Sequence, residues 1–94
     1  MTEKTLTAAR ALHARPASQL AKALGAFSCD ITLLAGGKEA NGKSVLSLMT
    51  LGVVAGADVT VRADGPDAEA AVETVAAELT TPEASAEPTQ AKGT

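Results

Sequence analysis

The feature that most constrains the fold of this chain is a change in hydrophobic spacing between residues 57 and 79. In Ala57–Ala63, apolar residues alternate with polar ones, and this two-residue period predicts a strand with one buried face. In Asp67–Leu79, apolar residues recur every three or four positions, which predicts an amphipathic helix. A strand and a helix that each have one apolar face must bury those faces together, so the chain must contain a sheet covered by helices.

Shorter patterns of the same kinds predict five more elements nearer the N-terminus. The helix Ala14–Leu24 has apolar residues at helical spacing, with Pro16 in its first turn and Gly25 just beyond its end. The pair Gly36-Gly37 predicts a hairpin turn. The other elements are the strands Thr5–Ala8, Asp30–Ala35 and Lys38–Ala40 and the short helix Ser44–Leu51. The order βαββαβα predicts an α+β fold in which helices stack on one side of an antiparallel sheet.

The length of 94 residues is that of one domain, and we expect residues 1–80 to form it. Residues 81–94 contain no large apolar residue and no periodicity, so we expect them to be a disordered C-terminal tail. A domain of this size has no room for a deep catalytic pocket. Phe27 is the only aromatic residue and the net charge is -3, which argues against nucleic-acid binding by base stacking or phosphate contacts.

Cysteine content and hydropathy limit the compartment and the cofactors. Cys29 is the only cysteine, so no internal disulfide can form and no zinc-binding spacing exists; we expect it to be a small buried side chain. No apolar stretch is long enough to span a membrane, and no signal-peptide pattern opens the sequence. We therefore expect a cytoplasmic protein that does not insert into a membrane and uses neither a metal nor a cofactor.

The only histidine of the chain, His13, falls where a loop meets the start of a predicted helix. The first helical turn exposes N–H groups and a positive dipole end, which together favour an anion. Pro16 has no N–H, so the expected donors are those of Ala14, Arg15 and Ala17. Arg15 adds a fixed positive charge, and a neutral imidazole beside an anion site can accept a phosphoryl group. On spacing alone, a second interpretation stays open, in which His13 is a weak helix cap and Arg15 a solvated charge.

The short helix Ser44–Leu51 has more apolar surface than one core contact requires. Ser44 is a plausible N-cap, and Gly52 a plausible stop. Leu48 and Leu51 point to one side, and the remaining apolar residues spread over the adjoining arc. They are Val45, Leu46 and Met49. An exposed apolar patch usually marks a protein interface. The alternative, a short helix buried all round, remains equally open at this point.

Two segments of the sequence are similar to the signatures of a known family. Residues 11–17, Ala-Leu-His-Ala-Arg-Pro-Ala, resemble the active-site segment of HPr, the histidine-containing phosphocarrier family of the phosphoenolpyruvate-dependent sugar phosphotransferase system. Residues 43–53, Lys-Ser-Val-Leu-Ser-Leu-Met-Thr-Leu-Gly-Val, resemble its second signature. The interval between them and the element order also match, and the resemblance covers about residues 1–80. It implies an open-faced β-sandwich, with a four-stranded antiparallel sheet and three helices on one face.

The resemblance implies a role for each matched residue. His13 matches the histidine that is phosphorylated on Nδ1, and Arg15 matches the arginine that balances and orients the phosphoryl group. Ser44 matches a regulatory serine that a dedicated kinase phosphorylates in some lineages. The positions that match exposed apolar docking residues are Val45, Leu46 and Met49.

The resemblance also implies partners. The protein would be a monomeric carrier and a substrate of its partners, not an enzyme. Those partners would be Enzyme I, the IIA domains of sugar permeases and, where the serine is used, HPr kinase/phosphorylase. Two alternatives remain: a regulatory carrier in a nitrogen-type or dihydroxyacetone-kinase phosphorelay, and a non-phosphorylated interaction module that has kept only the fold.

The active-site segment departs from the family pattern in two ways. Ala11 stands where the family usually has glycine, which permits backbone angles that alanine resists, so we expect the loop to differ in detail. Arg10 is an additional cation close to the site, and the resemblance gives it no role.

Overall fold

The computed structural model describes residues 1–80 as a four-stranded sheet with three helices, and the expected tail at 81–94 lies outside the described residues. The element order is βαββαβα, as predicted. The elements are β1 (Thr2–Thr7), α1 (Ala14–Leu24), β2 (Asp30–Ala35), β3 (Lys38–Asn41), α2 (Val45–Thr50), β4 (Asp58–Asp64) and α3 (Ala68–Thr80). Within residues 1–80, no helix is both long enough and apolar enough to cross a membrane.

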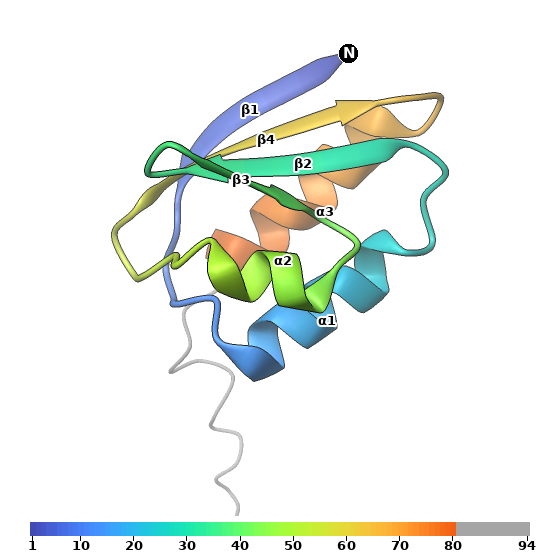
Figure 1. Cartoon of the computed structure of the whole chain (residues 1–94). Helices are drawn as coiled ribbons and strands as arrows, with labels where there is room; N and C mark the ends of the chain where they lie inside the picture. Colours follow the sequence, from blue (N-terminus) through green and yellow to red (C-terminus); the bar gives the residue numbers. More distant parts are fainter. Residues whose placement is uncertain (81–94) are drawn as a thin grey trace, which may run out of the picture.

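The sheet is antiparallel throughout, with the strands in the order β1-β4-β2-β3. The last strand in the sequence therefore lies inside the sheet, between β1 and β2. Figure 1 shows all three helices on the same side of this sheet. This arrangement confirms the α+β open-faced sandwich that the sequence predicted.

The two faces of the sheet have opposite character because side chains alternate along each strand. The face toward the helices carries the buried residues Ile31, Leu33, Ala40, Val59, Val61 and Ala63. On the open face, polar pairs cross between β1 and β4. The hydroxyls of Thr5 and Thr60 are 3.0 Å apart, and Arg62 Nε lies 3.8 Å from Glu3 Oε1. The hydrophobic core therefore lies between the sheet and the helices.

The strand β1 is the element whose predicted limits differ most from the structure. The sequence predicted Thr5–Ala8, whereas the strand begins at Thr2 and ends at Thr7. Its residues are mostly polar and exposed, so no alternation of large apolar residues marks its start. It is a strand because every residue from Thr2 to Thr7 pairs with β4. A strand that depends on tertiary pairing cannot be delimited from its own pattern. By contrast, α1 and β2 have the predicted limits.

A carboxylate just before α3 fastens the loop between α1 and β2. Asp67 accepts hydrogen bonds from the backbone N–H groups of Ser28 at 2.8 Å and Cys29 at 3.0 Å. These bonds, the one from Ser28 above all, hold the pKa of Asp67 below its ordinary value. Cys29 is buried, as expected, and its burial is the main cause that raises the pKa of its thiol. Gly65 packs directly against Cys29: a Cβ added at Gly65 would lie 2.7 Å from the Cβ of Cys29, so the backbone here has no room for a larger residue.

Asp67→Asn is expected to lower the melting temperature at neutral pH and to have little effect in strong acid. The pKa of this carboxyl is lower in the folded than in the unfolded protein. Its contribution to stability is therefore complete above the unfolded pKa of about 3.9 and is lost as the pH falls through the lower, folded value. Melting curves of both proteins between about pH 7 and about pH 2 test this. A difference in melting temperature that is the same at both ends of the range would contradict it.

Candidate functional site

His13 is the N-cap residue of α1, with the extended backbone that this position requires. Its carbonyl oxygen accepts a hydrogen bond from the N–H of Ala17 at 2.9 Å, which closes the first helical turn. Its side chain is exposed and makes no capping hydrogen bond to the helix. His13 is thus a weak helix cap in the sense that it occupies the N-cap position through its backbone and not through its side chain, and its imidazole stands at the positive end of α1.

Buried residues on both sides hold the exposed segment of His13, Ala14 and Arg15 in place. Leu12 is buried in the core, and its N–H donates to the carbonyl of Val53 at 3.0 Å. On the other side, Pro16 is buried within the first turn of α1. The chain therefore leaves the core at one residue and returns to it four residues later. Such a short, anchored segment presents the imidazole from a fixed backbone position.

The N–H donors at this helix end are fewer than the sequence analysis expected. The N–H of Ala17 is not available, because it already donates to the carbonyl of His13. This correction follows from helix geometry, since the fourth helical residue is the first whose N–H finds an acceptor one turn back. Ala14 and Arg15 precede it, and their N–H groups have no intrahelical acceptor. The first turn of α1 also contains no acidic residue to offset its dipole.

The two departures from the family pattern have different outcomes. Among residues 1–80, every residue with a positive φ is a glycine, so Ala11 adopts ordinary backbone angles without strain. The sequence predicts Arg10 to be an additional cation close to the site, but its side chain is buried and lies 3.2 Å from Glu78 of α3. No local sequence pattern indicates this contact, because the two residues are 68 positions apart.

The second motif forms α2, whose cap and exposed patch are both present. The hydroxyl of Ser44 accepts a hydrogen bond from the N–H of Ser47 at 3.3 Å, so Ser44 is the N-cap, as predicted. Leu48 and Leu51 are buried. The exposed fractions are 37% for Val45, 73% for Leu46 and 41% for Met49. These three residues are called the α2 patch below, and their exposure excludes a helix buried all round.

One exposed apolar residue near α2 was missed by the sequence analysis. Val54 is 59% exposed, whereas its neighbour Val53 is buried. The two valines follow Gly52, whose positive φ of 70° reverses the chain after α2. A pair of adjacent apolar residues directly after a turn would have been the signal, because only one of two neighbours in an extended segment can face the core.

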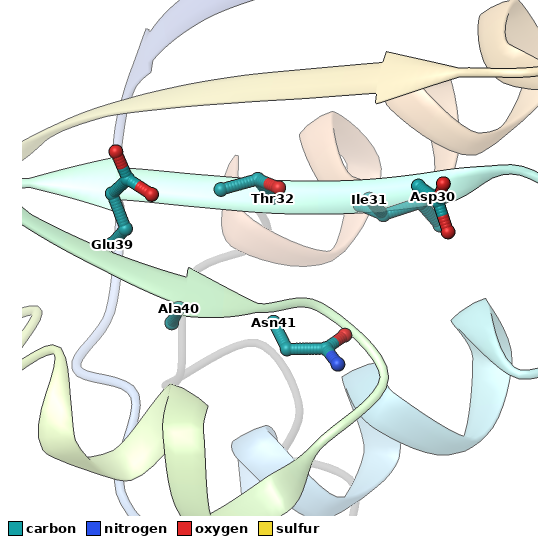
Figure 2. A pocket seen from close by; sticks show the side chains of 6 residues that line it. All are labelled: Asp30, Ile31, Thr32, Glu39, Ala40 and Asn41. Atoms are coloured by element: carbon teal, nitrogen blue, oxygen red, sulfur yellow. The ribbon is translucent and has the colours of Figure 1, made fainter.

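The side chains of His13 and Arg15 are exposed. Figure 2 shows a hollow elsewhere, between β2 and β3, whose lining includes neither residue. It is lined by Asp30, Ile31, Thr32, Glu39, Ala40 and Asn41. Residues 1–80 contain no group of three or more His, Cys, Asp or Glu side chains placed to hold a metal ion. Because the side chain of His13 is exposed, a second macromolecule that covers it would shield a group bound there from water.

Comparison with known proteins identifies the family. Residues 2–81 match the family model described as the PTS HPr component phosphorylation site. The chain belongs to the HPr family. This result confirms the sequence-based interpretation of an HPr phosphocarrier of the phosphotransferase system, and nothing in the comparisons favours the two alternatives.

Individual HPr proteins are similar to this chain over most of their length. The phosphocarrier protein HPr of Vibrio cholerae is 50% identical over 68 residues, which cover 72% of this chain and 80% of that protein. HPr of Haemophilus influenzae is 44% identical over 76 residues, which cover 81% of this chain and 89% of that protein. The crystal structure of HPr from Bacillus anthracis matches with a TM-score of 0.80 at 32% identity, covering 84% of this chain and 96% of that one. The open-faced sandwich is thus the fold of solved HPr structures.

Proposed function

We propose that this protein carries a phosphoryl group on His13 between partners of the phosphotransferase system. The donor is the phosphohistidine of Enzyme I, charged from phosphoenolpyruvate, and the acceptor is a histidine of a IIA domain. In each transfer, a neutral imidazole nitrogen attacks phosphorus and a new P–N bond forms. The P–N bond to the donor breaks, and its electron pair returns to the donor nitrogen. The carrier is regenerated in each cycle, so it is a substrate of its partners and not an enzyme.

The observation that carries this proposal is the exposed imidazole of His13 at the N-terminus of α1, two residues before Arg15. A phosphoryl group on His13 would lie at the positive end of the helix, near the N–H groups of Ala14 and Arg15. The guanidinium of Arg15 would balance its charge. At about 4 Å this attraction is roughly 1 to 4 kcal/mol per unit charge in water-like to surface-like surroundings.

The α2 patch is the proposed docking surface for both partners. Its three residues are apolar and exposed, and Met49 has the flexible side chain that suits a surface with more than one partner. A docked partner would also exclude water from the exposed side chain of His13. We further propose that residues 1–80 are sufficient for this carrier function and that the protein works in the cytoplasm, where Enzyme I would meet it.

The test is phosphorylation of the purified protein by Enzyme I of the same organism in the presence of labelled phosphoenolpyruvate. The expected product carries one acid-labile label, because phosphohistidine is hydrolysed in acid and phosphoserine is not. Enzyme I that charges an HPr from another bacterium but leaves this protein unlabelled would contradict the proposal.

Arg15→Ala is expected to slow phosphoryl transfer about 10-fold, because the exposed side chain should contribute near the lower end of the range of roughly 1 to 4 kcal/mol and tenfold corresponds to about 1.4 kcal/mol. Arg15 is exposed on the first turn of α1, so the loss of folding stability should be below about 1 kcal/mol. Rapid-quench measurement of transfer from phospho-Enzyme I, together with a melting curve, checks both parts. Arg15→Lys keeps the charge and should recover part of the rate; equal rates in Arg15→Ala and the parent would contradict the assigned role.

Ser44 is proposed as a site of regulation at the edge of the α2 patch. Its hydroxyl caps α2, so a phosphate there would meet the helix N-terminus without disrupting the helix. The charge of about -1.5 to -2 would lie next to Val45, the first residue of the patch. It would then have to be desolvated whenever a partner docks. The effect should fall on association and not on the chemistry at His13.

Ser44→Asp is expected to raise the apparent KM of Enzyme I for the carrier by about 3- to 10-fold, because the variant introduces about half the charge of a phosphate. The melting temperature should stay the same or rise, since aspartate is also a good N-cap. Steady-state phosphorylation against carrier concentration measures the KM. Ser44→Asn, a neutral cap, is the matched control and should behave as the parent. A KM equally raised by both variants would show that charge is not the cause.

A further inference from the structure

We propose that Arg10 is a positioning residue for the phosphoryl acceptor, and that it acts by clamping the loop before His13 to the last turn of α3. This inference rests on the carrier function proposed above. Arg10 precedes His13 by three residues, and neither the family match nor the docking surface gives it a role. Its side chain is only 9% exposed, so it does not act as a solvated cation beside the site.

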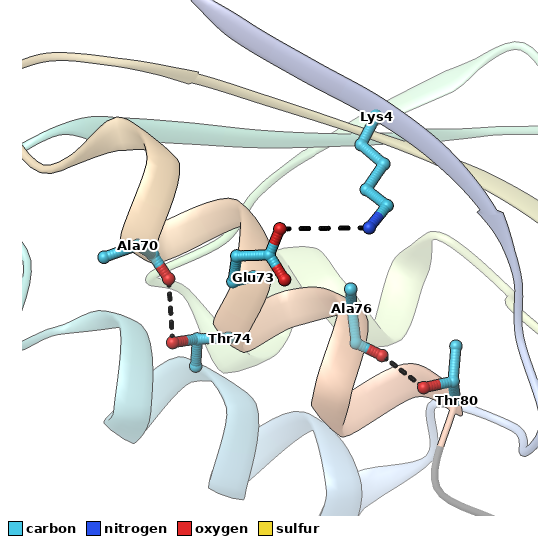
Figure 3. A network of polar contacts seen from close by, with 6 residues as sticks. All are labelled: Lys4, Ala70, Glu73, Thr74, Ala76 and Thr80. Atoms are coloured by element: carbon cyan, nitrogen blue, oxygen red, sulfur yellow. Dashed lines mark hydrogen bonds and ion pairs between the residues drawn. The ribbon is translucent and has the colours of Figure 1, made fainter.

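The partner of Arg10 is Glu78, in the last turn of α3. A guanidinium nitrogen of Arg10 lies 3.2 Å from the Oε1 of Glu78, in a partly buried contact. A second ion pair on the same helix, between Lys4 and Glu73, spans 3.9 Å and is exposed on both sides (Figure 3). Burial reduces screening by water and salt, so the pair of Arg10 and Glu78 should hold its geometry better than the exposed pair.

Two further observations bear on the place of Arg10, one a favourable charge interaction and the other an energetic cost. The last turn of α3 contains no basic residue, so Arg10 supplies, from the loop, the positive charge that a helix C-terminus favours. The Nε of Arg10 is buried without a hydrogen-bond partner among residues 1–80, which costs free energy. Proteins often retain an unsatisfied buried group of this kind at positions where the residue serves function in addition to stability.

The backbone around Arg10 is attached to the same helix end. The N–H of Ala9 donates to the carbonyl of Leu79 at 2.8 Å, so adjacent residues of the loop contact adjacent residues of α3. On the far side of Arg10, the N–H of Leu12 donates to Val53. His13 follows directly. The path from the end of α3 to the imidazole is therefore a short loop fixed at both ends, and the ion pair of Arg10 adds a polar side-chain attachment inside it.

This arrangement would act on the rate of transfer rather than on docking. In-line phosphoryl transfer requires the attacking nitrogen to be aligned with the donor phosphorus, and a misplacement of about 1 Å can cost roughly 100-fold. Releasing Arg10 would leave the loop attached by its backbone hydrogen bonds and by the buried side chain of Leu12, so His13 would spend less time aligned. The α2 patch lies on another element and would still bind the partner.

The experiment compares Arg10→Met, Glu78→Met and the double variant in Enzyme I-dependent phosphorylation of His13 at varied carrier concentrations. Each single variant is expected to lower kcat about 10-fold while KM stays within about twofold. The double variant should be no slower than the slower single variant, because both changes remove one clamp. Lys4→Met and Glu73→Met are the matched controls, since they remove the exposed pair on the same helix, and their kcat should equal that of the parent.

Three outcomes would overturn the proposal. Unchanged kcat in both single variants would make the pair purely structural. A slow Arg10→Met beside a normal Glu78→Met would mean that Arg10 acts without the clamp. An effect of equal size in the Lys4 and Glu73 controls would mean that any loosening of α3 suffices. Should melting curves show that Arg10→Met does not fold, Glu78→Met carries the comparison, because Glu78 is only half-buried.

A second measurement separates this inference from the carrier function. Hydrogen exchange of the Ala9 and Leu12 amides, followed by NMR on the unphosphorylated protein, reports the clamp directly. Exchange should be about 10-fold faster in the Arg10 and Glu78 variants and unchanged in the controls. If the parent accepts no phosphoryl group, the proposed function fails, and the exchange data still decide on the clamp. Exchange as slow in the variants as in the parent overturns it.

Discussion

Replacing His13 with alanine is expected to abolish acid-labile phosphorylation by Enzyme I and to leave the fold intact. His13 is the only histidine in the chain, so no second imidazole can take over the phosphoryl group. Its side chain is exposed and does not cap α1, and a surface change of this kind usually alters stability by no more than about 0.5 kcal/mol. Loss of the label with an unchanged melting curve would therefore assign the chemistry to His13.

The control for this change is Gln19→Ala, at another exposed position of α1. It should accept phosphoryl as the parent does, which excludes a general effect of alanine substitution on the helix surface. Base-stable, acid-labile label that persists in His13→Ala would contradict the assignment. Label that resists acid in both proteins would instead indicate a serine or threonine as the acceptor.

The elements that could be predicted are those in which the spacing of apolar residues along the sequence indicates the buried face. The limits of α1 and β2 agree with the prediction because their apolar residues repeat at regular intervals. In β4, Val59, Val61 and Ala63 are buried, as the alternation indicated. The strand β1 was predicted too short, because its first residues are polar and become a strand only through pairing with β4. Such pairing depends on distant residues, and no local pattern reports it.

The same distinction applies to the site. The positions of His13 and Ser44 at helix starts were predictable, because capping depends on neighbours in the sequence. The error about the N–H of Ala17 was local and avoidable, since helix geometry alone assigns that donor to the carbonyl of His13. The contact between Arg10 and Glu78 was not predictable, because it depends on where α3 ends relative to the loop.

Leu46→Asp is expected to raise the apparent KM of Enzyme I for the carrier by roughly 100-fold, without a change in melting temperature. Leu46 is the most exposed residue of the α2 patch, at 73%, so its substitution should change the folding stability of the free protein very little. On docking, a leucine side chain that becomes buried contributes about 1.5 to 3 kcal/mol. A carboxylate in its place would lose this contribution and would also have to be desolvated. Because tenfold in affinity corresponds to about 1.4 kcal/mol, the two effects together give the expected factor.

The added negative charge could by itself weaken association with an acidic partner, and Ala70→Asp controls for this. Ala70 is exposed on α3, so the variant carries the same net charge without touching the α2 patch. Its KM should stay within about twofold of the parent at physiological ionic strength, where charges more than about 8 Å apart are largely screened. At saturating carrier, Leu46→Asp should recover the kcat of the parent, because the residues around His13 are unchanged. A KM for Leu46→Asp no higher than that of Ala70→Asp would show that Enzyme I does not cover Leu46, and the α2 patch would then not be its docking surface.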